Sequence, residues 1–493
     1  MIKASRYWII SLLLGLMILL GLSSPSYTDS QSTNSQTIHV LNRLTFGPRP
    51  GDIQQVRSMG IDNYVQSQLR PETIKESQQF TNKLSTLKTL YLTPVQLFQQ
   101  YGPLPPNQKK QATEKEKKAR RQGTKKVVNE AIQANLIRAI SSNRQLEEVM
   151  INFWFNHFNV SVTKGRAVRL WIGTYERDAI RPYALGNFRD LLGATAHHPA
   201  MLFYLDNWLN TAPGSKGVRG IFKGLNENYA RELMELHTLG VNGGYKQEDI
   251  ITLAKIFTGW GIQRRTGDGS GFKFDANRHD NKDKIFLGIP IKGGGMAEGE
   301  KALDILANHP STARFISYKL AQYFVADEPP ETLIDKLAKR FQETKGDIRS
   351  VLGTLFASNE FWDEKYYGNK FKTPYQYIIS VVRAAGIDQP KFGRINGMLS
   401  QLGMPLYSCA TPDGYKNTRD AWLNSDAIIR RTSFATIISR GQLNQGKPKP
   451  INHEQLRVTL GNNFSPQTEA VINQNPGNLQ AALMLGSPEM MER

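Results

Sequence analysis

The amino-acid sequence predicts a mainly α-helical fold, a multi-helix globular body with at most a small β-hairpin. Apolar side chains recur every three or four residues along most of the chain, as they do on the buried face of a helix. The clearest run is 127–158, where Ile132, Leu136 and Ile140 share one face. Strand-type sequence is confined to 271–290, where the segments FKF and KIFLGI flank a turn and predict one hairpin.

The first 26 residues have the three parts of a secretory signal peptide. Lys3 and Arg6 precede an apolar run over 8–22, and small residues with one proline follow that run. The run is shorter than the roughly 20 apolar residues of a membrane-spanning helix, so we expect cleavage, with an uncleaved N-terminal membrane anchor as the alternative. No second run of spanning length follows. We therefore expect a periplasmic or extracellular protein, in which a polar linker over 27–36 precedes the body.

The body is predicted to open near Thr37 as short helices with short connections. Residues 39–44 are typical of a first helix, and Asp52 begins a second one with Ile53 and Val56 on its apolar face. The same periodicity predicts helices over 61–69, 127–158, 166–185, 187–209, 226–240, 246–259, 300–325, 331–343, 347–359, 373–386 and 422–440. We expect a helical domain over 37–440, and a polar C-terminal tail over 441–493 with one or two weak helices.

The chain is strongly basic, with 62 Lys and Arg residues against 43 Asp and Glu and a net charge of +19. Part of this excess lies in a basic insert over 105–127, where 109–126 alone holds nine Lys or Arg and two Glu. One interpretation is a solvated, partly disordered loop or helix face. The other is an electrostatic arm for an anionic partner. For an exported protein that partner is an anionic polysaccharide or the envelope surface, and no nucleic-acid motif is present.

Several common chemistries lack their motifs here. The sequence has no Gly-x-Ser-x-Gly, no P-loop and no Gly-x-Gly-x-x-Gly that opens a βαβ unit. The single cysteine, Cys409, cannot form an internal disulfide, and it has no catalytic-cysteine arrangement around it. We therefore expect core packing alone to stabilise this exported body.

Polar residues gather in the middle of the chain. Four of the eight histidines lie at His157, His197, His198 and His237, and the densest polar segment is 226–237. On a helix, the side chains spaced four residues apart share one face; these are Glu227, Arg231 and Glu235. Glu232 lies at the edge of that face, whereas His237 lies about 200° from Glu235 around the helix.

Three interpretations of this cluster stay open. In the structural one, Glu227, Arg231 and Glu235 form a buried ion network, and the histidines donate to backbone carbonyls. In the second, an acid–base site works on a substrate. Its catalytic residues are Glu232, Glu235 and His237, and its binding residues are Arg231, Asn228, Glu227 and Trp260, although Trp260 can also simply close the core. In the third, a divalent metal is bound by side chains from several helices; the ligands are His157, His198 (or His197) and His237 with a carboxylate.

The chain resembles the bacterial family known as domain of unknown function 1800. The resemblance runs over roughly 37–440, and the basic insert is not part of the family pattern. Its motifs are LNRLTFG from Leu41, FWFNHF from Phe153, GNFRDLL from Gly186, HPAML from His198, NENYAREL from Asn226, ELHTLG from Glu235, TGW from Thr258, ARFI from Ala313 and PDGY from Pro412. The resemblance implies a secreted, mostly helical protein with no established activity and no agreed catalytic residues. It also implies a partner, because family members are often encoded beside an exported sulfatase-like protein.

We therefore expect an exported helical protein of cell-envelope or extracellular-polymer biogenesis, with a central His/Glu/Arg polar site. One alternative is a metal-dependent or acid–base hydrolase that acts on an extracellular polymer. The other is a non-catalytic binding protein for anionic polysaccharide or the envelope surface. The hydrolase requires a cleft that holds these polar groups, at least one of them open to solvent. The binding protein instead predicts histidines and acids sealed in the core, and an exposed aromatic or basic groove.

Overall fold

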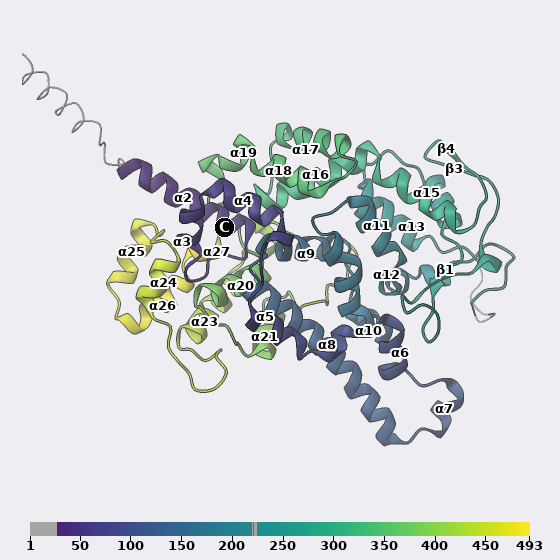
Figure 1. The fold of residues 1–493 in the computed structure, drawn as a ribbon, viewed down its shortest axis with the longest axis horizontal. Coiled ribbons are helices and arrows are strands. Elements are labelled where there is room, and N and C mark those ends of the chain that lie inside the picture. The colour runs from purple at the N-terminus through teal and green to yellow at the C-terminus, as the bar shows by residue number, and fades with distance from the viewer. Residues whose placement is uncertain (1–26, 219, 221–223) are drawn as a thin grey trace, which may run out of the picture.

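Helices make up most of the chain, and the predicted mainly α-helical fold is confirmed (Figure 1). The structure is a computed structural model that describes residues 27–218, 220 and 224–493. The predicted signal peptide, 1–26, lies outside the described residues. Among the helices that are described, none is long and apolar enough to cross a membrane.

The N-terminal helices are α2 (Tyr27–Leu44), α3 (Asp52–Met59) and α4 (Ile61–Leu69). Residues 27–36, for which the sequence predicts a linker, instead form the first half of α2. A polar composition does not prevent a helix when its second half is anchored, and Val40, Leu41 and Leu44 are fully buried. The polar half also has a partner far along the chain, because the Asn34 side-chain amide donates to the Gly461 carbonyl at 3.1 Å.

The basic insert is largely helical. After α5 (Gln78–Ser85) and α6 (Pro94–Tyr101), the chain forms α7 (Pro106–Gln111) and the 28-residue α8 (Glu114–Ser141). Thr113 and Glu116 form a capping box at the start of α8. The second half of α8 is buried, whereas its first half projects with α7 beyond the rest of the protein (Figure 1). We refer to residues 105–127 as the basic arm.

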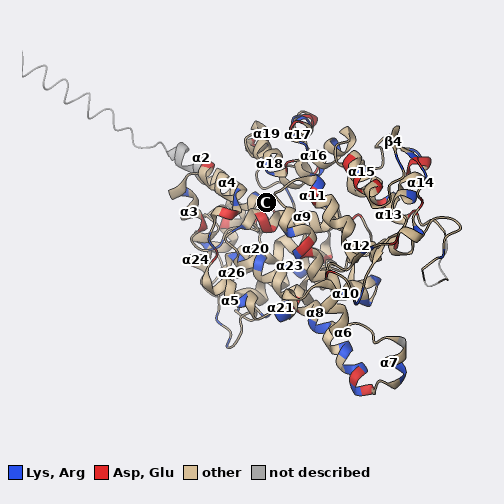
Figure 2. Cartoon of the chain, turned by 45° about the vertical axis from the view of Figure 1, so that its right-hand side comes forward, with Lys and Arg blue, Asp and Glu red and all other residues tan. Residues whose placement is uncertain are grey.

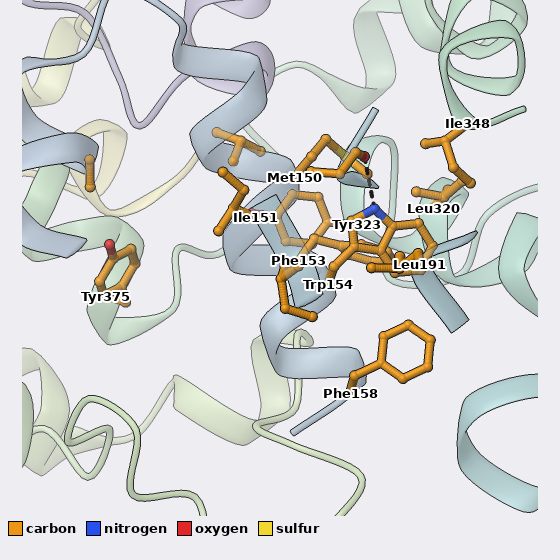
Figure 3. Packing of buried hydrophobic residues seen from close by; sticks show 14 of the residues in the cluster. Met150, Ile151, Phe153, Trp154, Phe158, Leu191, Leu320, Tyr323, Ile348 and Tyr375 are labelled. Atoms are coloured by element: carbon orange, nitrogen blue, oxygen red, sulfur yellow. Dashed lines mark hydrogen bonds between the residues drawn. The ribbon is translucent and has the colours of Figure 1, made fainter. Parts of the chain in front are cut away.

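The centre of the core is α9 (Gln145–His157). Trp154 is fully buried, and its indole N–H donates to the Ala184 carbonyl at 3.0 Å. Around it lie Met150 from the same helix, Leu191 and Leu320 from two other helices, and Phe158 at the end of α9 (Figure 3). Cys409 is buried and free.

The predicted helices over 166–185 and 226–240 each change geometry partway. Helix α10 (Arg166–Thr174) runs into a π-helical turn, η4 (Tyr175–Ile180), and α13 (Asn228–Glu232) runs into a second one, η7 (Leu233–Thr238). Between them lie α11 (Phe188–His197) and α12 (Pro199–Tyr204). π-Turns are rare inside helices and rotate the side chains that follow them.

The strands differ from the predicted single hairpin. The segment β2 (Phe272–Phe274) pairs with β1 (Trp260–Ile262), and β3 (Lys284–Phe286) pairs with β4 (Ile289–Ile291). The reason is a two-residue turn at Leu287 and Gly288, whose φ angles are 48° and 76°. Positive φ at both positions suits a tight hairpin, so β3 folds back on its own continuation and not on β2.

The remaining helices complete the body. In chain order they are α14 (Gln247–Ile256), α15 (Met296–Ala307), α16 (Pro310–Phe324), α17 (Glu331–Glu343), α18 (Ile348–Phe356), α19 (Asn359–Trp362), α20 (Pro374–Ala384), α21 (Phe392–Gln401), α22 (Arg419–Trp422) and α23 (Ser425–Ser439). The segment 441–493, predicted as a tail, adds α24 (His453–Thr459), α25 (Pro466–Asn473), α26 (Gly477–Leu485) and α27 (Pro488–Met491).

This C-terminal segment belongs to the body, which corrects the predicted boundary at 440. Several of its apolar side chains are buried, among them Leu456, Ile472 and Met484. Its end reaches the core, where the Arg493 guanidinium donates to the Tyr323 carbonyl at 2.6 Å. The polar composition of 441–493 therefore did not indicate that this segment packs against the body.

Candidate functional site

The Glu227–Arg231–Glu235 network forms as its spacing predicts, but it is not buried. Arg231 contacts Glu227 at 3.2 Å and Glu235 at 3.3 Å, with side-chain exposures of 37%, 34% and 26%. Gln247 of α14 joins it through Arg231 at 3.0 Å and Glu227 at 2.8 Å. Exposed ion pairs contribute only about 0–1 kcal/mol each, so this network links α13 to α14 without sealing a site.

The two other polar side chains of α13 also have local surroundings. The Asn228 side-chain amide donates to the Leu205 carbonyl at 3.1 Å, which fastens α13 to the end of α12. Glu232 is half-buried, and its burial, followed by the charge of Glu235, raises the pKa of its carboxyl. Neither side chain approaches a histidine closely enough for an acid–base pair to appear among the hydrogen bonds of the described chain.

The histidines lie in the core, as the structural interpretation expects. His157 Nε2 lies 3.0 Å from the His237 carbonyl oxygen, and the two ring centroids are 6.0 Å apart. Burial lowers the pKa of His157 to about 3 and holds that of His237 well below its ordinary value. Both rings are neutral at physiological pH, so His157 donates from Nε2. His237 is 1% exposed, whereas Glu235 is half-exposed; the π-helical turn η7 changes the angle of about 200° that a regular α-helix predicts between them.

The adjacent pair His197 and His198 serves two different helix ends. His198 Nδ1 accepts from the Ala200 N–H at 3.2 Å and caps α12, and its burial lowers the pKa to about 3. His197 Nδ1 lies 2.7 Å from the Gly193 carbonyl, and its Nε2 lies 2.8 Å from Glu300. Trp260 is fully buried 4.6 Å from the His197 ring, so it closes the core and does not line a site.

No group of three His, Cys, Asp or Glu side chains within 27–218, 220 and 224–493 could hold a metal ion. The described residues therefore give no support to the predicted metal site at His157, His198 and His237. His157 and His237 are neighbours, but His198 caps another helix with its acceptor nitrogen. The spacing of the histidines along the chain gave no information on which helix ends they would cap.

The basic arm carries exposed cations over most of its length. Figure 2 shows Lys and Arg along the projecting part of α8, with acidic residues confined to its start. Five of these side chains are exposed: Lys115, Lys118, Arg121, Lys125 and Lys126. Arg120 anchors the arm by donating to the Gly102 carbonyl at 2.8 Å and to the Gln99 carbonyl at 3.1 Å.

A groove of about 640 Å³ lies at the foot of the basic arm. Its walls include Phe98, Leu104, Lys109, Trp208, Arg264 and Arg265, and none of the described side chains that line it is acidic. The Arg264 guanidinium lies over three rings, 5.0 Å from Trp208, 5.6 Å from Phe98 and 5.7 Å from Phe203. Phe203 and Trp208 are themselves stacked at 5.4 Å. We refer to this feature as the aromatic groove.

The cations of this region repel one another. Burial, and then the charge of Arg120, lower the pKa of Arg265, and the same causes with Arg121 added lower that of Arg166. No carboxylate is among the causes that act on the pKa of Arg265 or Arg166. The aromatic groove and the basic arm therefore form one positively charged surface that can be neutralised by an external anion.

A larger hollow, of about 710 Å³, lies between α20, the end of α8 and the segment that precedes α24. Three of its cations have partners inside the protein. Arg49 pairs with Asp52 at 3.0 Å, Arg383 pairs with the same carboxylate at 3.1 Å, and Lys83 donates to the Asp388 carbonyl at 2.8 Å. Size alone therefore does not make it the better candidate.

Sequence reasoning identified the arm but not the groove beside it. Phe98, Trp208 and Arg264 come from three distant parts of the chain, and only the fold brings them together. The one local signal was the doublet Arg264-Arg265 beside a glycine-rich turn.

The comparisons with known proteins identify a family and leave the activity open. A family model described as "Protein of unknown function (DUF1800)" matches residues 39–492. This match continues through the basic arm and through the C-terminal segment, beyond the predicted limit at 440. Neither a curated protein nor a solved structure matches the chain. The chain belongs to the DUF1800 family of proteins of unknown function.

Proposed function

We propose that this protein is an exported, non-catalytic binding protein for an anionic polysaccharide of the cell envelope or extracellular matrix. The polymer lies along the basic arm and enters the aromatic groove. The observation that carries this proposal is the Arg264 guanidinium, held over Trp208, Phe98 and Phe203 in a groove whose described lining has no acid.

The two parts of this surface supply different contributions to binding. Aromatic faces and arginines give contact area with little loss of conformational freedom, which is why they dominate binding sites. The exposed first eleven or so residues of α8 extend about 17 Å at 1.5 Å per residue. Charges this far apart are screened from one another at physiological salt, where the Debye length is about 8 Å. The arm therefore acts through several separate contacts along an extended polyanion.

The placement of the predicted polar site favours binding over hydrolysis. His157, His198 and His237 are buried with 8%, 6% and 1% exposure, and the Glu227 and Glu235 carboxylates are engaged by Arg231. The exported location rests on the sequence of residues 1–26. An exported sulfatase-like partner, which the family resemblance implies, fits the same class of ligand, because sulfate esters also make a polysaccharide anionic.

Binding to polygalacturonate tests the proposal, with neutral dextran as the uncharged polymer. The arm variant replaces three exposed cations at Lys118, Arg121 and Lys125 with Gln. The control variant replaces three exposed lysines elsewhere, Lys301, Lys339 and Lys447, and so changes the net charge equally. We expect the arm variant to bind polygalacturonate at least tenfold more weakly than the unchanged protein, and the control to stay within twofold.

Salt and nucleic acid provide two further readouts. Affinity for polygalacturonate should fall steeply between low and physiological salt, because surface charges are screened. Equal binding to dextran, or equal losses in the arm and control variants, would show that the arm is not the binding surface. Tighter binding to double-stranded DNA than to polygalacturonate at physiological salt would assign the surface to another polymer.

A further inference from the structure

A chamber of about 240 Å³ lies where α9, α16 and the loop 412–418 meet. Its walls include His157, Tyr318, Lys319, Tyr323, Asp413 and Lys416. It shares none of its lining residues with the aromatic groove. The inference below therefore stands apart from the proposed polymer binding.

The loop wall of the chamber is held rigidly against α9. The Asn156 side chain accepts from the Tyr415 N–H at 2.8 Å and donates to the Tyr415 carbonyl at 2.9 Å. Asn159 donates to the Cys409 and Thr411 carbonyls at 3.1 and 2.8 Å. These side-chain amides hydrogen-bond to the backbone of the loop and hold it in place, so the chamber is preformed.

One positive charge in this chamber is uncompensated. Asp413 is paired with Lys416 at 2.6 Å, and His157 is neutral. Lys319 is half-buried and forms no ion pair or hydrogen bond with any residue in the described part of the chain; the Phe315 ring lies 5.3 Å from its ammonium nitrogen. The charge of Asp413 acts on Lys319 as well as on Lys416, so one carboxylate faces two ammonium groups and the site favours an added anion.

For two hydroxyl protons, no acceptor is found among the residues that the structure describes. The Tyr318 hydroxyl oxygen accepts from the Gln322 amide at 2.9 Å, and the Tyr323 hydroxyl oxygen accepts from the Gln376 amide at 3.2 Å. Each phenol is therefore used as an acceptor, and its own proton is free to be donated. An ammonium and two donating hydroxyls match a ligand rich in acceptor oxygens.

We infer that the chamber binds a compact, oxygen-rich ligand with a single carboxylate, of the size of a uronic acid monomer, whose carboxylate pairs with Lys319. One unpaired cation balances one negative charge, whereas a dianion such as phosphate would leave a buried charge without a partner. The chamber has room for a small ligand such as a monosaccharide acid.

Galacturonate is the probe, and galactose and inorganic phosphate are its neutral and dianionic comparisons. Mass spectrometry follows acylation of Lys319 by an amine-reactive ester, and calorimetry measures affinity. We expect galacturonate to slow acylation of Lys319 at least fivefold while exposed Lys301 reacts unchanged. In calorimetry, Lys319→Met should weaken galacturonate binding at least tenfold, which is about 1.4 kcal/mol, and Lys301→Met should not change it.

Other outcomes overturn the inference. They are equal protection by galactose, protection by phosphate but not by galacturonate, no protection by any probe, or unchanged affinity in Lys319→Met. Tyr318→Phe keeps the ring and removes the free proton, so it should weaken binding severalfold even if Lys319→Met proves hard to purify. The arm variant Lys118→Gln, Arg121→Gln, Lys125→Gln should bind galacturonate normally, because the two sites are separate.

Discussion

Gly414→Ala should destabilise the protein by about 3–4 kcal/mol, because two separate costs meet at this residue. Gly414 has a φ angle of +70°, and an L-residue in the left-handed region costs about 1–2 kcal/mol. A Cβ atom there would also lie 2.2 Å from the Asn156 carbonyl oxygen and 2.7 Å from its side-chain oxygen. The loop must then move and lose both Asn156–Tyr415 hydrogen bonds, at about 1 kcal/mol each.

Two other glycines separate these costs. Gly368 has a φ angle of +62° but has open space where a Cβ would lie, so Gly368→Ala should cost only the conformational part, about 1–2 kcal/mol. Gly397 lies inside α21 with ordinary φ and open space. Gly397→Ala should therefore stabilise the protein by about 0.5–1 kcal/mol.

Urea unfolding, followed by far-ultraviolet circular dichroism, measures the three variants against the unchanged protein. Acylation of Lys319 supplies a second readout, because displacement of the loop 412–418 opens the chamber and should accelerate the reaction in Gly414→Ala alone. If Gly414→Ala costs no more than Gly368→Ala and leaves Lys319 equally protected, Asn156 does not hold the loop as closely as described. That result would contradict a rigid attachment of the loop 412–418 to α9.

Three further predictions concern buried charge, pH and the aromatic groove. Glu176→Gln should lower the free energy of unfolding, measured in urea, by about 3–5 kcal/mol. The reason is that this buried carboxylate accepts a hydrogen bond from Tyr407 at 2.5 Å and pairs with Arg181 at 3.1 Å. A loss below 1 kcal/mol would contradict the importance of these two contacts. The pKa values of His157 and His198, lowered to about 3 by burial, mean that only the unfolded chain takes up their protons between about pH 6.5 and pH 3. Stability should therefore fall as the pH falls through this window, by about 1.4 kcal/mol per pH unit for each ring, and His198→Asn should make urea midpoints at pH 7.5 and pH 5 differ less than in the unchanged protein. Trp208→Ala should weaken polygalacturonate binding at least fivefold in the same assay as the arm variant, and unchanged affinity would place the polymer on the arm alone.

The sequence predicted what depends on local spacing. The four-residue spacing of Glu227, Arg231 and Glu235 placed all three on one face, and the structure pairs them. It could not predict their exposure, because that depends on what packs against the other side of α13. The same limit applies to His237, whose neighbour, His157, lies 80 residues away.

Features that depend on distant contacts escaped the prediction. The C-terminal segment looked like a tail because its apolar residues are sparse, yet Arg493 bonds to Tyr323, 170 residues earlier in the chain. The predicted hairpin joined the wrong strands because the turn at Leu287 and Gly288 has two positive φ angles. A leucine in the sequence does not indicate a positive φ angle. The aromatic groove depends on the proximity of Phe98 and Trp208, which are 110 positions apart and which no local sequence pattern links.

His157 lines the chamber, and its place there bears on whether the chamber is a catalytic site. A general base works best when its pKa lies near the working pH, whereas burial lowers the pKa of His157 to about 3. Its Nε2 proton is also committed to the His237 carbonyl, which fixes the ring. A base this weak does not accept a proton readily near neutral pH, so His157 lines the chamber as an uncharged side chain. The Lys319 ammonium can pair with a carboxylate without any proton transfer, which agrees with the inferred binding of a carboxylate ligand in the chamber.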